Sequence, residues 1–470
     1  MQHDHSSITN IDIGTFKYWK YKGEGACNVV LTYHGPNNSK LNGRVLRVKK
    51  TNVSSTTIGT LLNGNEDQVN KDISDFKFVA DKMSFILNSR YVYPGEIIRV
   101  TKEFLEQLDE HILNDRPKSR SKLRIDTNIT IAFLIQDLSM FRDVSIPGHH
   151  FQSPKENFSP SLSPSPSSSF TRDQIICIEI KPKWGFLQSR SEFITNAKDV
   201  KSNTCRYCMH QYIKLQEGSI SEISNYCPLD LYCNSNDNDD NNSMNIDRKK
   251  KAIKELFYHP QNNLKIYIDG ELAFTGSLGG GNDLSKEESI QMIGSLFRPT
   301  LSTQSLCELV SAILSRESIL SNLKSVQLYD ELDIEAIYYL YCKLNQIPNT
   351  IGYQLNSQSK LDQLTNDQIR EYISRFLISA TVKDCSIMLS FNNNSKFNSD
   401  TIQSFKFINS LDISSNTTIN FNDNNIIYYK IGIVDLDKKK ESSIPNYYKT
   451  DKLIIENYQN NCNNKKQCTE

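Results

Sequence analysis

The hydrophobic positions in the first third of the chain alternate with polar ones in the way that is typical of β-strands. Residues 17–50 contain three β-prone runs, and a Gly-Glu-Gly turn separates the first two. A further apolar run covers residues 129–136, whereas residues 73–87 place their apolar side chains at helical spacing. Residues 51–72 are rich in Ser, Thr and Asn, which predicts a loop.

Helical spacing dominates the second half of the chain. Four segments have this spacing and the length of ordinary helices, namely 285–296, 305–323, 333–344 and 366–380. Short β-prone runs lie before them, at 175–180 and 265–268, and after them, at 386–391 and 426–436. The two halves together predict the α+β fold class.

Two polar segments interrupt these patterns. Residues 151–171 are a Pro/Ser-rich stretch that cannot bury enough apolar area to offset its chain entropy, so we interpret it as a disordered insert or linker. Residues 234–245 form an Asn/Asp-rich insert. We therefore expect a β-rich N-terminal unit over residues 1–150 and a larger α+β unit over residues 172–470.

Composition narrows the class of protein. Lys and Arg together number 54, as do Asp and Glu, so no global field favours nucleic acid or a membrane, and we expect neither as a partner. The eleven cysteines follow no framework spacing, and the first residues contain no apolar signal segment. No apolar run approaches the roughly 18 residues that span a bilayer. We expect a reduced, monomeric protein of the cytoplasm or the nucleus.

The Gly-rich turn is the first candidate for chemistry. Backbone N–H groups of the run Gly-Glu-Gly-Ala-Cys-Asn at 23–28 could cover the phosphates of a nucleotide, and Arg47 on a following strand could reach one of them. No Gly-Lys-Ser/Thr follows, so the turn is not a P-loop. Taken alone, an ordinary hairpin turn is the favoured interpretation.

A basic strand end follows residue 178. Alternation places Glu179, Lys181 and Lys183 on one face, and Pro182 ends the strand because it donates no hydrogen bond. Two lysines at a rim can bind phosphate, and Glu179 can offset the cost of desolvating them. A solvated strand end explains the run equally well.

A second basic cluster lies on an expected helix. Arg206, His210 and Lys214 are four residues apart and form one stripe, which an anion could neutralise. A solvated basic face is the alternative. Cys205 and Cys208 form a Cys-x-x-Cys pair, but structural zinc requires four ligands and no second pair completes the set nearby. We therefore expect no metal at this pair.

Amides and carboxylates supply the remaining candidates. Asn262 and Asn263 could donate to hydroxyl or phosphate groups, although a turn explains them as well. Asp384 opens an apolar strand, and Asp435 and Asp437 end another. Carboxylates beside a polyphosphate suit Mg²⁺, and one acid on the metal with another accepting a hydroxyl proton is the plan of phosphoryl transfer. Combined with the Gly turn and the basic clusters, they favour an ATP-dependent kinase.

At these positions the chain resembles the inositol-pentakisphosphate 2-kinase family. Seven runs occur in the family's order: Gly-Glu-Gly-Ala-Cys-Asn at 23–28, Glu-Ile-Lys-Pro-Lys at 179–183, Cys-Arg-Tyr-Cys-Met-His-Gln at 205–211, Pro-Gln-Asn-Asn at 260–263, Leu-Asp-Ile-Glu at 332–335, Lys-Asp-Cys-Ser-Ile-Met at 383–388 and Asp-Leu-Asp at 435–437. The resemblance implies ATP-dependent phosphorylation of the 2-hydroxyl of inositol 1,3,4,5,6-pentakisphosphate to inositol hexakisphosphate (phytate). It also implies a two-lobed inositol phosphate kinase fold distantly similar to protein kinases.

The resemblance also implies roles for individual residues. Asp384 would be the base on the 2-hydroxyl, and Lys181 would serve the transferred phosphate. The nucleotide and its Mg²⁺ would be held by Gly23, Gly25, Asn28, Arg47, Asp137, Glu179, Asp435 and Asp437. The substrate's phosphates would be held by Arg120 (or Arg116), Lys183, Arg206, His210, Lys214, Asn262, Asn263, Lys439 and Tyr447.

Two departures from the family and two rival interpretations remain. Ser443 stands where family members can carry a basic residue, with Lys440 as the candidate replacement. The His-Cys-Cys-His zinc set of plant members has no counterpart after residue 330, so we expect no structural zinc. A catalytically inactive inositol-polyphosphate-binding scaffold and a kinase of another inositol phosphate or lipid headgroup would use the same cationic site.

Overall fold

The computed structural model describes most of the chain. The described residues are 9–25, 27–36, 39–52, 64–118, 120, 122–141, 174–188, 191–233, 242–276, 284–297, 301–393, 404–412, 425–461 and 466–470. The Pro/Ser-rich stretch at 151–171 and most of the Asn/Asp-rich insert lie outside them, so both interpretations stay predictions.

A seven-stranded sheet forms the N-terminal unit. Its strands are β1 (Thr9–Asn10), β2 (Trp19–Glu24), β3 (Asn28–Tyr33), β4 (Arg44–Asn52), β5 (Glu96–Arg99), β6 (Leu123–Ile125) and β7 (Ile131–Gln136). The order is β1-β5-β7-β4-β3-β2, and β6 pairs with β4. Helix α3 (Lys102–Ile112) and two 3₁₀-helices, Ile13–Tyr18 and Leu113–Asp115, accompany the sheet. The core beneath α3 contains fully buried Trp19, Leu46 and Phe104. The strands predicted within 17–50 and 129–136 are confirmed.

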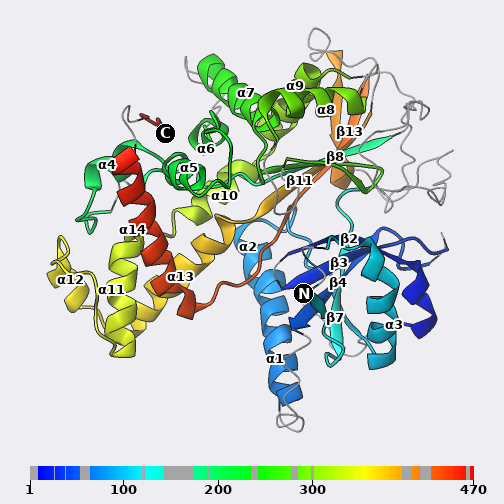
Figure 1. The fold of residues 1–470 in the computed structure, drawn as a ribbon, viewed down its shortest axis with the longest axis horizontal. Helices are drawn as coiled ribbons and strands as arrows, with labels where there is room; N and C mark the ends of the chain where they lie inside the picture. The colour runs from blue at the N-terminus through cyan, green and yellow to red at the C-terminus, as the bar shows by residue number, and fades with distance from the viewer. Residues whose placement is uncertain are drawn as a thin grey trace.

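One long helical run stands beside this sheet (Figure 1). It comprises α1 (Gly64–Lys77), a π-helical stretch (Phe78–Met83) and α2 (Ser84–Ile86). The helix predicted at 73–87 is confirmed, but the loop predicted at 51–72 is wrong at residues 51–52, which end β4, and from residue 64 onward, where α1 begins. Tertiary contacts explain the longer helix, because Asp72 is buried against Lys49 and the ring of Phe76 stacks on Phe133 at 5.7 Å.

A six-stranded sheet organises the rest of the chain. Its strands are β8 (Ile175–Ile180), β9 (Leu264–Ile268), β10 (Glu271–Thr275), β11 (Ser386–Asn392), β12 (Lys406–Asn409) and β13 (Ile426–Val434). The order is β10-β9-β8-β11-β13-β12. Every residue of β8 and β11 is buried, which explains why their sequences are continuous apolar runs rather than alternating ones. The predicted strands in this half are confirmed.

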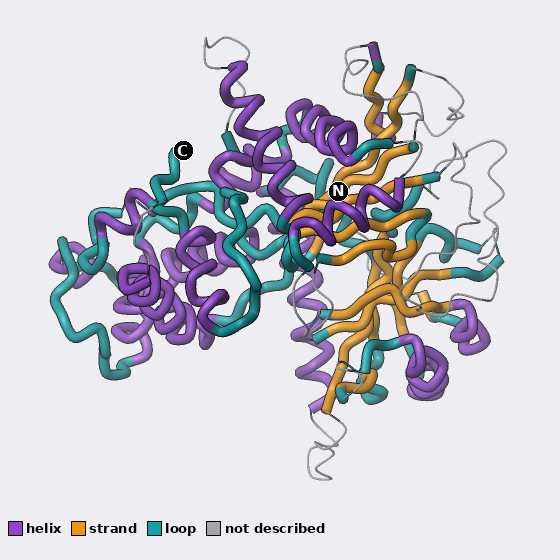
Figure 2. Tube along the Cα trace, turned by 45° about the horizontal axis from the view of Figure 1, so that its top comes forward, coloured by secondary structure: helices purple, strands orange, loops and turns teal. Residues whose placement is uncertain are grey.

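Helices cover this second sheet and extend away from it. They are α4 (Lys198–Asn203), α5 (Arg206–Gln216), α6 (Pro228–Leu231), α7 (Asn242–Tyr258), α8 (Lys286–Phe297), α9 (Thr303–Arg316), α10 (Ile319–Gln327), α11 (Asp333–Asn345), α12 (Gln358–Asp362), α13 (Asn366–Val382) and α14 (Ile444–Asn461), with short 3₁₀-helices at Ser410–Asp412 and Glu441–Ser443. In Figure 1, α7, α8 and α9 lie over the second sheet, while α11 to α14 form a group to one side. Figure 2 shows the same division between a helical side and a strand-rich side.

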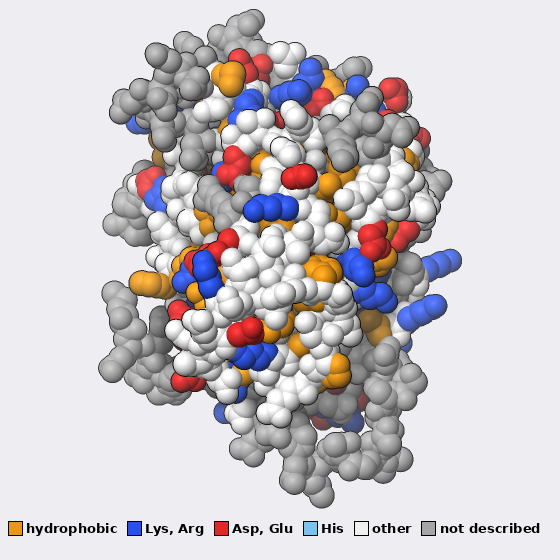
Figure 3. All heavy atoms as spheres, turned by 90° about the vertical axis from the view of Figure 1, so that its left-hand side faces the viewer, with side chains coloured by type: hydrophobic (Ala, Val, Ile, Leu, Met, Phe, Trp, Pro, Cys, Tyr) orange, Lys and Arg blue, Asp and Glu red, His pale blue; other side chains and the backbone are white. Residues whose placement is uncertain are grey.

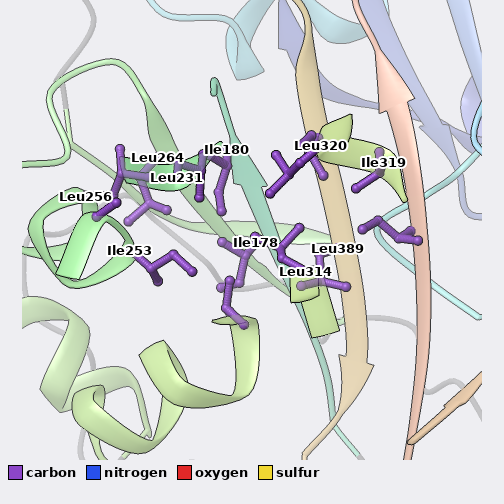
Figure 4. Packing of buried hydrophobic residues seen from close by; sticks show 14 of the residues in the cluster. Ile178, Ile180, Leu231, Ile253, Leu256, Leu264, Leu314, Ile319, Leu320 and Leu389 are labelled. Atoms are coloured by element: carbon purple, nitrogen blue, oxygen red, sulfur yellow. The ribbon is translucent and has the colours of Figure 1, made fainter. Parts of the chain in front are cut away.

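The main core lies between the second sheet and its helices. Figure 4 shows Ile178 and Ile180 of β8 and Leu389 of β11 packed against side chains of α6, α7, α9 and α10. Each such side chain contributes about 1.5–3 kcal/mol when it is fully buried. The strand ends that follow this core are therefore held in fixed positions.

The helix predicted at 305–323 is broken in the structure. It forms α9 and α10, separated at Glu317 and Ser318. The carboxylate of Glu317 accepts hydrogen bonds from Tyr91 and Tyr429, each at 2.7 Å, and the Ser318 N–H donates to the Tyr91 hydroxyl. These contacts with distant residues replace the helical hydrogen bonds that the local sequence would otherwise form.

The architecture confirms the α+β fold class, whereas the finer resemblance to protein kinases stays a prediction. The search for membrane-spanning helices covered the described residues, and none of their helices is both long and apolar enough to cross a bilayer. Figure 3 shows acidic and basic side chains interspersed on the face in view, in keeping with equal numbers of both signs in the sequence.

Candidate active site

Strand register brings three predicted residues to one edge of the second sheet. β8 and β13 are both antiparallel to β11, so their C-terminal ends meet its N-terminal end (Figure 1). Ile180 is paired with Ile387, and Ser386 with Val434. Lys181, Asp384 and Asp435 therefore all lie within two residues of the same edge.

The amide residues and the basic helix α5 join this edge. β9 starts there, because Leu264 is paired with the last residue of β8, and the Lys181 N–H donates to the Asn263 carbonyl at 2.9 Å. The Asn263 side-chain amide donates to the Tyr207 hydroxyl of α5 at 3.2 Å. A second link runs between Gln261 and Gln211 at 2.7 Å. Asn263 is buried, whereas Asn262 is exposed at the turn.

The segment after β8 is fixed by its backbone carbonyl groups. Tyr226 donates to the Pro182 carbonyl at 2.9 Å, and Gln327 donates to the Lys183 carbonyl at 2.8 Å. Lys183 has a φ of 64°, an unfavourable conformation for a residue with a side chain. The alternation predicted through Lys183 therefore ends with the strand at Ile180, and hydrogen bonds hold the two lysines in place instead.

The predicted acids face cations from distant parts of the chain. Lys439 donates to Asp384 at 2.8 Å, Lys181 lies 3.8 Å from Asp435, and Arg47 of β4 pairs with Asp437. Burial would raise the pKa of Asp384, but Lys439, Lys183 and Lys181 together hold it below the ordinary value. Asp384 is thus an ionised carboxylate at neutral pH, as a proton acceptor must be.

Two of the predicted cations have strongly lowered pKa values. Burial, together with the charges of Lys181 and Lys214, lowers the pKa of Lys183 to about 8, although Asp384 opposes the shift. Burial and the neighbours Lys214, Arg206 and Lys183 lower the pKa of His210 to about 3. His210 is therefore neutral in the free protein. Burial is the largest cause of both shifts, and neighbouring cations contribute to both, so several positive groups lie close together here.

Glu179 has partners that the sequence reasoning did not identify. Its buried carboxylate accepts hydrogen bonds from Lys265 at 3.1 and 3.2 Å, Tyr267 at 2.8 Å and Ser386 at 3.1 Å. Burial would raise its pKa, but Lys265 and Tyr267 hold it below the ordinary value. Alternation within β9, which places Lys265 and Tyr267 on one face, was the available signal.

The Gly-rich turn is held in place by ion pairs of Glu24, and there is free space next to its two glycines. Glu24 pairs with Lys50 and Arg116, and the Gly25 N–H donates to the Asn28 carbonyl at 3.0 Å. A Cβ atom placed on Gly23 or Gly25 would meet no atom of the described residues within 4 Å. The packing of the described residues therefore does not explain why glycine stands at either position. A ligand whose phosphates approach the backbone closely would explain it, because glycine has no side chain in the way.

The two candidate arginines after α3 differ in availability. The Arg116 side chain is fully buried and donates to Glu24 at 3.1 and 2.8 Å. Arg120 is exposed and lies beside the same turn, since its carbonyl accepts from Arg116 at 3.1 Å. The contacts favour Arg120 as the ligand and give Arg116 a structural role.

Asp137 lies between the two sheets. Its buried carboxylate accepts from Lys22 at 2.9 Å and from Thr32 at 3.2 Å, and Lys22 also donates to the Gly270 carbonyl at 2.9 Å. Although burial opposes it, Lys22 and the neighbouring Ser139 hold the pKa of Asp137 below its ordinary value. Asp137 therefore helps to join the sheets, and its place beside the adenine stays a prediction.

A buried charge network lies beneath the basic end of α5. Lys201 pairs with Asp333 at 2.7 Å, with Glu335 at 3.4 Å and with Asp451 at 2.9 Å. Arg206 pairs with the same Asp451 and lies 5.1 Å from the centre of the Trp184 ring. The Leu-Asp-Ile-Glu run at 332–335 thus helps to position Arg206 indirectly, through Lys201 and Asp451. The sequence reasoning did not assign this role.

Tyr447 of α14 completes the surroundings of Asp384. Its pKa is raised by burial and by Asp384, whereas Lys439 and a hydrogen bond with Ser443 oppose the shift. Ser443 thus supports Tyr447, and the candidate replacement Lys440 is exposed nearby. The predicted cage residues Lys439 and Tyr447 are both neighbours of Asp384.

The structure corrects the ligand count behind the expectation of no metal at the Cys-x-x-Cys pair. The thiols of Cys205 and Cys208 lie with those of Cys227 and Cys468, and all four sulfur atoms are within 4.8 Å of one another. The sequence reasoning searched near the Cys-x-x-Cys pair, whereas the fourth thiol comes from the end of the chain. The premise that no further ligands complete the pair is therefore wrong.

Comparison with known proteins places the chain in a family. The family profile described as Inositol-pentakisphosphate 2-kinase matches residues 21–453. The chain is 31% identical to Inositol-pentakisphosphate 2-kinase IPK1 of Oryza sativa subsp. indica, over 95% of each protein. It is 29% identical to the Inositol-pentakisphosphate 2-kinase of Arabidopsis thaliana, over 96% of this chain and 94% of the relative. For the Inositol-pentakisphosphate 2-kinase of Danio rerio the identity is 25%, over 94% and 92%. The chain therefore belongs to the inositol-pentakisphosphate 2-kinase family.

Proposed function

We propose that this chain transfers the γ-phosphoryl group of ATP to the 2-hydroxyl group of inositol 1,3,4,5,6-pentakisphosphate, giving inositol hexakisphosphate. The observation that carries the proposal is the shared edge of the second sheet, where Lys181, Asp384 and Asp435 come from three different strand ends. An inactive scaffold would need the cations alone. The two carboxylates beside them suit proton transfer and metal binding, so they favour catalysis.

Asp384 is the proposed base. It accepts the proton of the 2-hydroxyl group while that oxygen attacks the γ-phosphorus of ATP, the bond to the bridging oxygen breaks, and ADP leaves. Lys439 now occupies the Asp384 carboxylate at 2.8 Å, so it moves to a substrate phosphate when the hydroxyl group arrives. Lys181 stabilises the charge on the transferred group.

The remaining cations bind the substrate. Inositol pentakisphosphate carries roughly −8 charge or more, because each phosphate contributes about −1.5 to −2. Lys183 has a pKa lowered to about 8 by burial and by neighbouring cations. The positive charges of Lys183 and its neighbours repel one another in the free protein. A bound polyanion lessens this repulsion, which favours binding in addition to the direct contacts. The proposed phosphate contacts are Arg120, Lys183, Arg206, His210, Lys214, Asn262, Asn263, Lys439 and Tyr447.

The nucleotide binds between the Gly-rich turn and the sheet edge in this proposal. Backbone N–H groups near Gly23, Gly25 and Asn28 cover the phosphates, Arg47 reaches them from β4, and Glu179 borders the pocket. Asp435 and Asp437 are oxygen donors close to these groups, so the residues present fit Mg²⁺. The metal would lessen the repulsion between the phosphate oxygens and the incoming hydroxyl.

The finer fold assignment belongs to the same proposal. We infer that the two sheets are the cores of two lobes, an N-lobe over residues 1–150 and a C-lobe over residues 172–470, in the manner of a distant protein-kinase relative. The contacts Arg47–Asp437 and Lys22–Gly270 join the two parts near the proposed nucleotide site, which supports this inference.

Incubation with Mg·ATP and a panel of inositol pentakisphosphate isomers tests the proposal. Asp384→Asn should lower turnover by about 10²- to 10⁴-fold and leave ATP binding intact, because it removes only the base. Asp367→Asn is the matched control. It makes the same change in the first turn of α13, whose 17 residues place it about 25 Å from Asp384.

Chromatography of the products separates the rivals. Formation of hexakisphosphate only from the isomer with a free 2-hydroxyl supports the proposal. Tight binding without any product would indicate the scaffold, and faster phosphorylation of another inositol phosphate or of a lipid headgroup would indicate a different kinase. Unchanged turnover in Asp384→Asn would contradict the assignment of the base.

A further inference from the structure

The half-buried ring of Trp184 lies against two cations of the candidate active site. The ammonium nitrogen of Lys383 is 3.9 Å from the centre of this ring, and the central guanidinium carbon of Arg206 is 5.1 Å from it. Both distances are within the roughly 6 Å at which the face of an indole ring attracts a cation. One side chain thus contacts both a proposed phosphate ligand, Arg206, and the residue directly before the proposed base, Asp384.

The backbone on each side of Trp184 is fixed by Gln327, the buried last residue of α10. The Lys183 carbonyl accepts a hydrogen bond from the Gln327 side-chain amide at 2.8 Å, and the Gly185 N–H donates to the Gln327 side-chain oxygen at 2.7 Å. A Cβ atom on Gly185 would lie 2.4 Å from the Tyr232 ring, so a larger residue does not fit here. These contacts fix the base of the indole side chain independently of the two cations.

Lys383 is the more firmly held of the two cations. Its side chain is 3% exposed and pairs with the fully buried carboxylate of Asp330 at 2.5 Å, and Gln188 donates to the same carboxylate at 3.2 Å. Burial lowers the pKa of Lys383, Asp330 opposes the shift, and the positive charge of Arg206 adds to it. Lys383 and Arg206 therefore lie close enough to repel each other, and the aromatic ring beside both lessens the cost of keeping them together.

Arg206 is the more exposed cation, with 18% of its side chain accessible. It begins α5, pairs with Asp451 and shares its stripe with His210 and Lys214. An aromatic ring beside a guanidinium group limits its orientation, because the planar group stacks on aromatic faces. Trp184 and Asp451 together therefore restrict where the guanidinium group of Arg206 can lie.

We propose that Trp184 is a positioning residue for the inositol substrate, because its ring fixes the phosphate ligand Arg206 relative to Lys383. Since Lys383 directly precedes the base Asp384, the ring sets how far a bound phosphate lies from the base. This inference rests on the proposed function, from which it takes the roles of Arg206 and Asp384. Loss of the ring leaves the Lys383–Asp330 pair intact. It should therefore weaken substrate binding without displacing the base.

Steady-state kinetics of Trp184→Leu measures this effect. KM for inositol pentakisphosphate should rise by about 2- to 30-fold, the range expected for loss of one cation–π contact. KM for ATP and kcat should stay close to the wild-type values. Trp184→Phe should give a smaller rise, because a benzene ring attracts a cation less strongly than an indole ring. A merely structural role would lower the amount of folded enzyme and leave both KM values unchanged.

A double-mutant cycle with Arg206→Met determines whether Trp184 acts through Arg206. Arg206→Met alone should raise KM for the inositol substrate. Adding Trp184→Leu to it should change KM by less than about twofold, because the ring then has no guanidinium group to hold. The same large effect of Trp184→Leu in both backgrounds would show that the ring acts independently of Arg206, which would refute the proposal.

Phe407→Leu is the matched control. The half-buried ring of Phe407 lies 4.2 Å from the guanidinium carbon of Arg316, so this substitution also removes an aromatic ring beside an arginine. Phe407 pairs with Ile427, seven positions before Val434, which places it about 23 Å from the sheet edge of the candidate active site. Both KM values should be unchanged. A rise as large as that of Trp184→Leu would contradict the assignment.

Tryptophan fluorescence tests the inference without turnover. The chain contains two tryptophans, and the other, Trp19, is fully buried in the core of the first sheet. Titration with inositol 1,3,4,5,6-pentakisphosphate in the absence of ATP should change the emission of the wild type, because a bound phosphate neutralises the cation beside the indole ring. The change should be absent from Trp184→Phe and smaller in Arg206→Met.

Two fluorescence results would overturn the proposal. They are an unchanged emission of the wild type at saturation, with binding shown by calorimetry, and an emission change that persists in Trp184→Phe. Because this measurement needs no phosphoryl transfer, it is distinguishable from failure of the kinase proposal, which would appear as binding without product.

Discussion

Two lysines in this molecule, the buried Lys201 and the half-buried Lys183, have pKa shifts of opposite sign. Lys201, beneath α5, has its pKa raised despite burial, because Asp333, Asp451 and Glu335 surround it. Lys183, at the sheet edge, has its pKa lowered to about 8, because burial and other cations outweigh Asp384. The first cluster is complete within the protein, whereas the second has an excess of positive charge that a polyanion can neutralise. The partners around each lysine, rather than the presence of lysine, distinguish the two clusters: three carboxylates face Lys201, whereas Lys181 and Lys214 add positive charge beside Lys183.

The largest expected effect concerns the complete cluster. Lys201→Met should lower the free energy of unfolding by about 3–5 kcal/mol, because three carboxylates lose their shared cation. Urea denaturation measures the change. Lys198→Met, an exposed position on the same helix, should have little effect. Equal stability of the two variants would remove the distinction between the clusters.

The second effect concerns the sheet edge and should appear in turnover rather than stability. Lys181→Met should lower kcat by about 10²- to 10³-fold, because it removes one preorganised donor to the transferred phosphoryl group. Its unfolding midpoint should stay close to that of the wild type, because the ammonium is partly exposed and its ion-pair partner within the part of the chain that the structure describes, Asp435, lies as far away as 3.8 Å. Steady-state kinetics and a urea titration read the two quantities. A large loss of stability with normal kcat would assign Lys181 to the structural class.

The third effect is a pH dependence. Lys183 carries a charge below pH about 8 and loses it as the pH rises through that value, so kcat/KM for the inositol substrate should fall above pH 8. The substrate phosphates do not cause this fall, because their second ionisation makes the substrate more anionic as the pH rises, which favours binding to cations. Lys183→Arg should move the fall to higher pH because guanidinium stays charged. An alkaline limb that is identical in both proteins would refute the role of Lys183.

The smallest expected effect concerns Gly25 in the Gly-rich turn, outside both lysine clusters. It should change the affinity for ATP but not the affinity for the inositol substrate. Gly25→Ala should raise KM for ATP by about 2- to 12-fold, which corresponds to one neutral hydrogen bond of about 0.5–1.5 kcal/mol. KM for the inositol substrate should change little. Stability should not fall, because the added Cβ meets no atom of the described residues. A drop in the unfolding midpoint would mean that the glycine serves the fold rather than the nucleotide.

Local pattern was sufficient for the strands but not for their pairing. The apolar runs of β8, β11 and β13 can be recognised as buried strands from the sequence alone, because such strands consist mainly of β-branched and large apolar residues. Which ends meet depends on tertiary register, which no short window contains. The candidate residues Lys181, Asp384 and Asp435 were therefore found one by one, and only the sheet shows that they share an edge.

Distance along the chain explains what the sequence reasoning missed. Lys265 pairs with Glu179 across 86 positions, and Cys468 meets Cys205 from the other end of the chain. Burial is equally invisible to a short motif, because Arg116 and Arg120 look alike in the sequence although only Arg120 is exposed. The residue types were predictable, whereas their partners depended on the fold.

A structure of the protein bound to inositol 1,3,4,5,6-pentakisphosphate and a non-hydrolysable ATP analogue tests the central claim most directly. The account predicts the 2-hydroxyl oxygen within about 2.6–3.2 Å of the Asp384 carboxylate, with Lys439 displaced from it and the phosphates in contact with Lys183 and His210. A substrate bound elsewhere, with the Asp384–Lys439 pair intact, would contradict it.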